Sequence, residues 1–287
     1  MTERGRNASV APKTSESFGH HDLDSVVALN FHQKASPEVP RSAVIITKNA
    51  SSQLAKCLES VSFCDEVLVV DSGSSDDTIM LARNAHATVV EQAWLGYGPQ
   101  KRFAVARATN DWVLCIDADE RISEPLRDNI LAELRAPVGR VYAISRCNRF
   151  LGRWLRHGEG YPDWCIRLFN RKDAHWSEDL VHEKVLTHAP VARLAGDLLH
   201  ESAESLESYL EKQNRYTSLQ AEGLHARGKT ASVLQLLGSP LARFFKFYFL
   251  RLGFLDGVPG LIHVCIGCMN SFNKYAKLMA LTRAEGL

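Results

Sequence analysis

The chain has 287 residues, enough for one large domain or one domain with appendages, and 45% of them are hydrophobic, so it can bury a core. Lys and Arg number 34 against 33 Asp and Glu, so no overall charge favours nucleic acid, and we expect no nucleic-acid partner. The seven cysteines are an odd number scattered through apolar segments, which favours reduced thiols in a cytoplasm over a disulfide framework.

Residues 1–40 mix Ser, Pro, His and charged residues without hydrophobic periodicity. Such a segment buries too little apolar surface to offset the entropy of folding, so we expect a disordered leader outside the folded domain. It also lacks the apolar run of a signal peptide.

Short apolar strands alternate with amphipathic helices from Ser42 to Glu120. The predicted strands cover residues 42–47, 65–73, 86–92 and 111–120, and the predicted helices cover residues 52–61, 74–85 and 98–110. This alternation predicts an α/β fold with a mostly parallel open sheet flanked by helices. In such sheets ligands bind outside the carboxyl ends of the strands.

Polar side chains follow three of these strands where each one ends. They are Thr47 and Asn49, then Asp71, then Asp117, Asp119 and Glu120. Carboxylates of this kind hold Mg²⁺ or Mn²⁺, whose other positions go to water and phosphate. Alternatively, the acids cap the helix that Ser123 opens, which explains Glu120 well. It explains Asp117 poorly, because a carboxylate directly after "VLCI" is costly unless a cation or donors meet it.

Two more features near these strand ends have both a nucleotide-binding and a structural interpretation. Asp71 either accepts hydrogen bonds from a ribose or a base, or is a turn residue. Lys101 and Arg102 begin a predicted helix in "GYGPQKRFA", where they either face phosphate or carry solvated surface charge.

The remainder of the chain predicts further strands at residues 141–150 and 164–171, with helices at residues 123–136 and 204–228. Residues 175–185 read as a polar stretch between strands. The last part, residues 239–283, is rich in aromatic side chains and is interrupted by charged ones, so it predicts no membrane-spanning helix. Basic residues among Phe and Tyr suit a helix at a membrane surface. The alternative is a helical cap that packs on its own domain or on a second subunit.

Taken together, "VIITKNASSQLAKCLESVSFCDEVLVVDSGSSDDTIMLARN", "GYGPQKRFAVARATNDWVLCIDADE" and "WSEDLVHE" resemble the family 2 inverting glycosyltransferases with the GT-A fold, in particular the lipopolysaccharide core glucosyltransferases of the WaaE/KdtX type. The resemblance covers roughly residues 42–285. It implies a Rossmann-like GT-A domain at residues 41–200 and a C-terminal helical extension at residues 201–287 that associates with a membrane.

The resemblance also implies roles for individual residues. Thr47, Asn49 and Asp71 would hold the base and ribose of a nucleotide sugar, a UDP-sugar above all. Arg102 is added to this nucleotide site from its place at the helix start, and not from the resemblance. Asp117 and Asp119 form the DxD-like element: Asp117 would contact the nucleotide sugar and Asp119 would bind the divalent metal, Mg²⁺ or Mn²⁺. Glu120 would be the cap of the following helix or a support for the metal ligands.

An inverting transferase needs one base, and "WSEDLVHE" supplies the carboxylates. The common family pattern favours Asp179 of the pair Glu178 and Asp179, whereas the "VHE" of the subgroup favours Glu183, which we prefer. His182 is either a site residue or a structural one. His200 resembles a recurrent histidine near the diphosphate or the metal.

The predicted function is therefore hexose transfer to a lipid-linked or oligosaccharide acceptor of the cell envelope, by a cytoplasmic enzyme peripheral to the inner face of the membrane. One alternative is a polyprenyl-phosphate glycosyltransferase of the same fold, whose phosphate acceptor needs no carboxylate base. Another is a non-catalytic binding module in which the acids cap helices. A receiver-like signalling domain fits the length less well.

Overall fold

The structure, a computed structural model, describes residues 39–180, 183–202 and 205–284. The predicted leader, residues 1–40, lies outside the described residues except for its last two. His182 also lies outside them.

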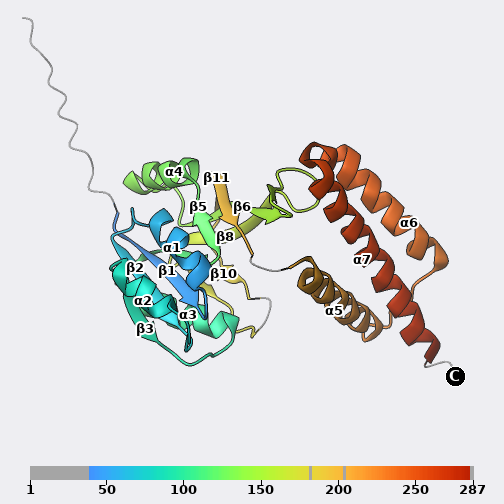
Figure 1. Ribbon diagram of the computed structural model, residues 1–287, viewed down its shortest axis with the longest axis horizontal. Coiled ribbons are helices and arrows are strands. Elements are labelled where there is room, and N and C mark those ends of the chain that lie inside the picture. Colours follow the sequence, from blue (N-terminus) through green and yellow to red (C-terminus); the bar gives the residue numbers. More distant parts are fainter. Residues whose placement is uncertain (1–38, 181–182, 203–204, 285–287) are drawn as a thin grey trace, which may run out of the picture. The chain divides into compact units, whose positions relative to one another are not determined.

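The first half of the described chain alternates strands and helices as the sequence predicts (Figure 1). Its elements are β1 (Arg41–Thr47), α1 (Ser51–Ser60), β2 (Glu66–Asp71), α2 (Thr78–Asn84), β3 (Thr88–Glu91), α3 (Tyr97–Arg107) and β4 (Trp112–Asp117). The strands β3, β2, β1 and β4 are neighbours in this order and are all parallel. The predicted parallel sheet is therefore confirmed for this half.

The second half extends the same sheet with strands of both directions. Its elements are β5 (Glu120–Ile122), α4 (Glu124–Arg135), β6 (Val141–Phe150), β7 (Arg153–Trp154), β8 (Asp163–Asn170), β9 (Ala174–Trp176), β10 (Val185–Thr187) and β11 (Val191–His200). The sheet order continues from β4 through β8, β6 and β11 to β5. Strand β8 is antiparallel to both β4 and β6, whereas β11 is parallel to β6. The whole is a mixed GT-A-like sheet.

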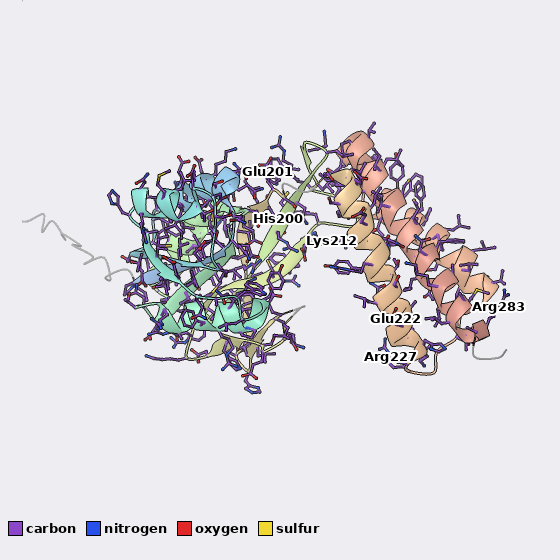
Figure 2. All side chains as sticks on the ribbon, turned by 60° about the horizontal axis from the view of Figure 1, so that its bottom comes forward. His200, Glu201, Lys212, Glu222, Arg227 and Arg283 are labelled. Carbon is purple, nitrogen blue, oxygen red and sulfur yellow. The ribbon has the colours of Figure 1, made fainter. Side chains whose placement is uncertain are left out.

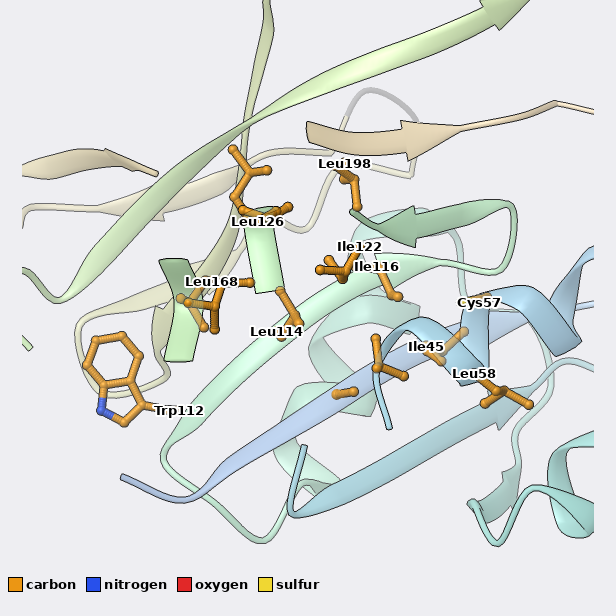
Figure 3. Close-up of a cluster of buried hydrophobic side chains, with 14 of the residues drawn as sticks. Ile45, Cys57, Leu58, Trp112, Leu114, Ile116, Ile122, Leu126, Leu168 and Leu198 are labelled. Carbon is orange, nitrogen blue, oxygen red and sulfur yellow. The ribbon is translucent and has the colours of Figure 1, made fainter. Parts of the chain in front are cut away.

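Helices cover both faces of this sheet because the strands carry apolar side chains on both sides. One cluster packs Ile45 and Leu114 of the sheet against Cys57 and Leu58 of α1 and Leu126 of α4 (Figure 3). On the opposite face, side chains of α3 pack over the strands with Trp176. This double cover fixes the strand ends at one edge.

One sequence prediction needs correction here, and one strand was missed. Glu120 does not cap the following helix: it lies in β5, and Ser123 is the N-cap, whose Oγ accepts from the Leu126 N–H at 3.4 Å. The polar stretch 175–185 does lie between strands, and only its ends belong to β9 and β10, which pair with each other. Strand β11 was not predicted, because "VARLAGDLLH" is short of β-branched residues and contains Gly196.

The C-terminal part of the described chain is helical. It comprises α5 (Leu206–His225), α6 (Val233–Phe244), a π-helical turn η1 (Phe245–Leu250), a 3₁₀ turn η2 (Gly253–Asp256) and α7 (Gly257–Ala284). Helix α7 packs against α5 and α6. The predicted boundary at residue 200 coincides with the end of β11. The predicted start of the tail at residue 239 is late, since Ser232 and Gln235 form a capping box that opens α6.

One buried carboxylate ties these helices to the strands. Asp256 of η2 is 2% exposed and accepts hydrogen bonds from the backbone N–H groups of Arg156 and His157, at 3.0 and 2.8 Å.

Within the described residues, no single helix has the length and hydrophobicity to cross a membrane. The segments Val233–Leu250 and Gly253–Ala284 pass this test only as a pair bent by 72°.

Candidate active site

The strand register brings the predicted polar residues to the same edge of the sheet. Thr47 at the end of β1 lies opposite Asp71 at the end of β2. On the other side of β1, Ile46 lies opposite Asp117 at the end of β4. The ends of three neighbouring strands therefore converge there, as expected for the carboxyl edge of a parallel sheet.

Asp71 organises the loop that follows β2. Its buried carboxylate accepts from the backbone N–H groups of Gly73 and Ser74, at 2.9 and 2.8 Å, and from the Ser74 hydroxyl at 2.5 Å. Gly73 has φ +84°, a conformation that side chains disfavour. Asn49 joins the same loop, because its Oδ1 accepts from the Ser75 N–H at 2.8 Å. The nucleotide contacts of Asp71 and Asn49 stay predictions. The hydrogen bonds within the loop hold both side chains in place.

Thr47 presents a hydroxyl that the protein leaves unused. Its side chain is buried, and its Oγ1 has no hydrogen-bond partner among the described residues. Because buried polar groups are nearly always paired, this hydroxyl is suited to a ligand at the strand edge.

Asp117 lies between two cations. Lys101 Nζ is 2.9 Å from one carboxylate oxygen, and an Nη of Arg167 is 2.8 Å from the other. Burial alone would raise the pKa of Asp117, but Arg167 and Lys101 outweigh it and hold that pKa well below its usual range. Asp117 is thus ionised at neutral pH. Because the two cations compensate its charge, the buried strand can end in an acid.

Glu120 shares the same arginine. It is fully buried, one of its oxygens lies 2.7 Å from Arg167, and the other accepts from the Asp117 N–H at 3.0 Å. Burial would lower the pKa of Arg167, whereas Glu120 and Asp117 raise it well above its usual value. Glu120 therefore holds Arg167, and through it Asp117, in place.

Asp119 points to a different group from Asp117. Its Oδ2 lies 3.2 Å from His200 Nε2, at the end of β11 (Figure 2). His200 Nδ1 lies 2.7 Å from Asn148 Oδ1, which can only accept, so Nδ1 carries a proton. Nε2 then either carries a second proton or offers its lone pair, together with the Asp119 carboxylate, to a cation.

A carboxylate and an imidazole side by side are a donor set that can hold a divalent cation. In the structure Asp119 Oδ2 and His200 Nε2 are joined directly, at the 3.2 Å of a hydrogen bond or ion pair. Across the part of the chain that the structure describes, no group of three or more His, Cys, Asp or Glu side chains forms a metal site. Water and diphosphate would therefore supply the other ligands, as is usual for Mg²⁺.

The predicted bases lie in different surroundings. Glu183 Oε1 is 2.8 Å from Lys101 Nζ, so Lys101 joins Glu183 to Asp117. The Asp179 side chain is exposed. Its backbone carbonyl accepts a hydrogen bond from the N–H of Gly98 at 3.1 Å. Any side chain at position 98 would collide with the carbonyl oxygens of Ser177 and Asp179. The geometry thus connects Glu183, and not the Asp179 carboxylate, to the acids of the sheet edge.

Two adjacent basic residues of helix α3, Lys101 and Arg102, point to different places. Lys101 is 5% exposed and also lies over the Trp176 ring, with 4.7 Å between Nζ and the ring centroid. Arg102 is exposed and pairs with Glu178 at 2.6 Å. The phosphate contact predicted for Arg102 stays a prediction, while Lys101 is the basic residue that reaches the acids.

Arg167 was missed by the sequence analysis. A lone arginine in "WCIRLFN" is a usable signal, because an arginine inside an apolar strand needs a buried partner. Its partners could not be named, since β8 inserts between β4 and β6 only through long-range pairing.

Comparison with known proteins shows which family this chain belongs to. The model of the family described as Glycosyl transferase family 2 matches residues 42–189. A protein of Rickettsia typhi named an uncharacterized glycosyltransferase is 35% identical over 254 residues, covering 84% of this chain and 87% of that protein. The lipopolysaccharide core biosynthesis glycosyltransferase LpsC of Rhizobium meliloti is 30% identical over 251 residues, covering 84% and 93%.

Solved structures align more distantly. S. aureus TarS 1-349 in complex with UDP-GlcNAc aligns with a TM-score of 0.46 and 15% identity, covering 86% of this chain and 92% of that chain. Glucosyl-3-phosphoglycerate synthase from Mycobacterium tuberculosis, in complex with Mn²⁺, UDP and glucosyl-3-phosphoglycerate, aligns with a TM-score of 0.34 and 24% identity, covering 40% and 46%. At these TM-scores the two structures say nothing of individual residues in this chain.

Proposed function

The chain belongs to glycosyl transferase family 2 and is a glycosyltransferase, and we propose that it moves a hexose, with inversion, from a UDP-sugar to a saccharide acceptor of the cell envelope. The observation that carries this proposal is the pair Asp119 and His200 beside the charged cluster of Asp117. It supports a metal-bound diphosphate at the carboxyl edge of the sheet.

The residues suit a single displacement at the anomeric carbon. An acceptor hydroxyl forms the new C–O bond while the bond to the diphosphate breaks, and the electron pair of that bond leaves with the diphosphate. Glu183 removes the hydroxyl proton, with Lys101 holding its carboxylate in position. Asp119 and His200 would hold Mg²⁺ or Mn²⁺, which would offset the charge of the departing diphosphate.

The acceptor class is supported by sequence similarity. The relative LpsC carries lipopolysaccharide core biosynthesis in its name, and the alignment with it covers 93% of that protein. We therefore propose a saccharide of the lipopolysaccharide core, free or lipid-linked, as the acceptor.

Calorimetric titration of the purified protein with UDP, GDP and dTDP, each with and without Mn²⁺, tests the proposed donor. We expect UDP to bind, and to bind at least about tenfold more tightly with Mn²⁺, because Asp119 would hold a cation that offsets the charge of the diphosphate. Equal affinity for the three nucleotides would contradict the UDP-sugar assignment. Binding of none of them would remove the proposed function.

We further propose that the enzyme lies on the inner face of the cell membrane through α6 and η1. Five large apolar side chains, three or four residues apart, are exposed there; we call them the apolar stripe, namely Leu234, Leu237, Leu241, Phe245 and Phe249. Exposed basic side chains, Lys246 and Arg251, lie next to it in the sequence. Apolar side chains flanked by cations suit an anionic lipid surface.

Replacing two members of the apolar stripe by acids, L241D with F249D, is expected to weaken binding to phosphatidylglycerol vesicles by at least about tenfold. Each change removes an apolar side chain worth about 1.5–3 kcal/mol when buried and adds a charge that the lipids repel. Vesicle co-sedimentation measures this, with L219D on α5, another exposed leucine, as the control. Unchanged sedimentation of the double variant would exclude this surface.

A further inference from the structure

The predicted metal ligands belong to the lining of a large cavity. It has a volume of about 720 Å³, and both Asp119 and His200 line it. Its other walls come from the turn after β6, the start of α5 and His263 of α7. Lys212 of α5, which Figure 2 labels, also belongs to the residues that line it. Ligand cavities usually measure about 300–1,000 Å³, so the volume of this cavity is in the range of a ligand-binding site.

The cavity is lined by other residues than those assigned to the nucleotide. Among the residues that line it, none is one of the predicted nucleotide contacts, which are Thr47, Asn49, Asp71, Arg102 and Asp117. The lining does include the predicted metal ligands, Asp119 and His200. A donor whose diphosphate lies at Asp119 would therefore leave this space for a second substrate.

The walls combine aromatic rings with hydrogen-bonding groups. The centroid of the Phe150 ring lies 5.6 Å from that of the Tyr209 ring and 5.3 Å from that of the His263 ring. The Tyr209 hydroxyl lies 3.4 Å from His263 Nε2. Asn148 and Ser205 add polar groups along the walls. A sugar ring has C–H groups that pack on aromatic rings and hydroxyls that need polar partners, so it matches these walls.

We propose that this cavity, which we call the acceptor cavity, binds the acceptor saccharide, and that Tyr209 and His263 determine which saccharide is accepted. The proposal rests on the proposed function. It assigns to α5 and α7 a part in substrate selection, because Tyr209 and His263 belong to these two helices.

Neutral His263 supports this assignment. Burial and the nearby Arg243 lower the pKa of His263, and Asp256 opposes them only in part. A neutral imidazole both donates and accepts, so together with the Tyr209 hydroxyl it can discriminate between sugar hydroxyls by their positions.

Two variants of α5 test the acceptor cavity. Y209A removes an aromatic wall, and L206W fills the space, since Leu206 lines the cavity and is 39% exposed. Y216A is the matched control: Tyr216 is half-buried on the same helix but does not line the cavity. The probe is deacylated lipopolysaccharide core oligosaccharide, titrated calorimetrically in the presence of UDP and Mn²⁺.

We expect Y209A and L206W to raise the Kd of the oligosaccharide at least about tenfold, while the Kd of UDP and all values of Y216A stay within twofold of wild type. Unchanged oligosaccharide binding in both variants, or an equal loss of UDP binding, would overturn the proposal. So would a wild-type protein that binds UDP but not the oligosaccharide, although the proposed donor would stand. A wild-type protein that binds no nucleotide would instead refute the proposed function itself.

Discussion

Replacing Asp119 by alanine is expected to reduce sugar transfer by about a thousandfold or more while the fold survives. Among the described residues, Asp119 is the carboxylate paired with His200, and its removal would cost the metal a ligand and the reaction about 4 kcal/mol of transition-state stabilisation. Because the Asp119 side chain is 31% exposed and outside the Arg167 cluster, its loss leaves no buried charge unpaired. Transfer of radiolabelled sugar measures activity, and circular dichroism measures the fold.

The D128A variant is the matched control, since Asp128 is an exposed aspartate of α4 that pairs only with its neighbour Arg127 among the interactions described. It should keep wild-type activity. Chelation of divalent metal should reduce wild-type activity to the level of D119A and should leave D119A unaffected. A folded D119A protein with full activity would rule out the metal-dependent mechanism.

Replacing Glu183 by glutamine is expected to lower kcat by about 10²–10⁴-fold. Glutamine can still accept the hydrogen bond from Lys101 but cannot take a proton from the acceptor, so the loss falls on the chemical step. The Kd of UDP with Mn²⁺ should stay within about twofold. Steady-state kinetics together with calorimetry separate the two quantities.

The D179N variant distinguishes the two predicted bases, because the Asp179 carboxylate is exposed and not joined to Lys101 in the described contacts. We expect its kcat to fall by less than about fivefold. E59Q, which changes an exposed glutamate of α1 outside the predicted site, serves as the control. A large loss in D179N with little in E183Q would reverse the assignment, and full activity in both would favour a phosphate acceptor that needs no base.

The sequence predicts the first half of the sheet well because a short, local pattern of residues determines each strand and helix there. Apolar runs such as "AVII" and "VLVV" give the strands, and the polar residues that follow them mark the carboxyl edge. That edge carries Thr47, Asp71 and Asp117 in the structure, as predicted.

Prediction fails where long-range pairing decides the outcome. The chain turns between Asp117 and Glu120, so the acids of one short segment diverge: Asp119 toward His200, Glu120 toward Arg167. Spacing alone could not reveal this, because β5 owes its place to β11, about 80 residues later. Likewise, the aromatic-rich C-terminal part predicted from residue 239 begins inside α6, which starts at the capping box of Ser232.

The shared cations at the sheet edge also restrict how this protein can change over generations. Arg167 serves both Asp117 and Glu120, so a neutral residue at position 167 would leave two acids without their common counter-charge. Losing one partner of a buried pair costs about 3–5 kcal/mol, a large part of a total stability of about 5–15 kcal/mol. Losing Glu120 first would cost less stability, because Arg167 would still pair with Asp117. The viable mutational path therefore has a direction: the acid goes first and the arginine follows.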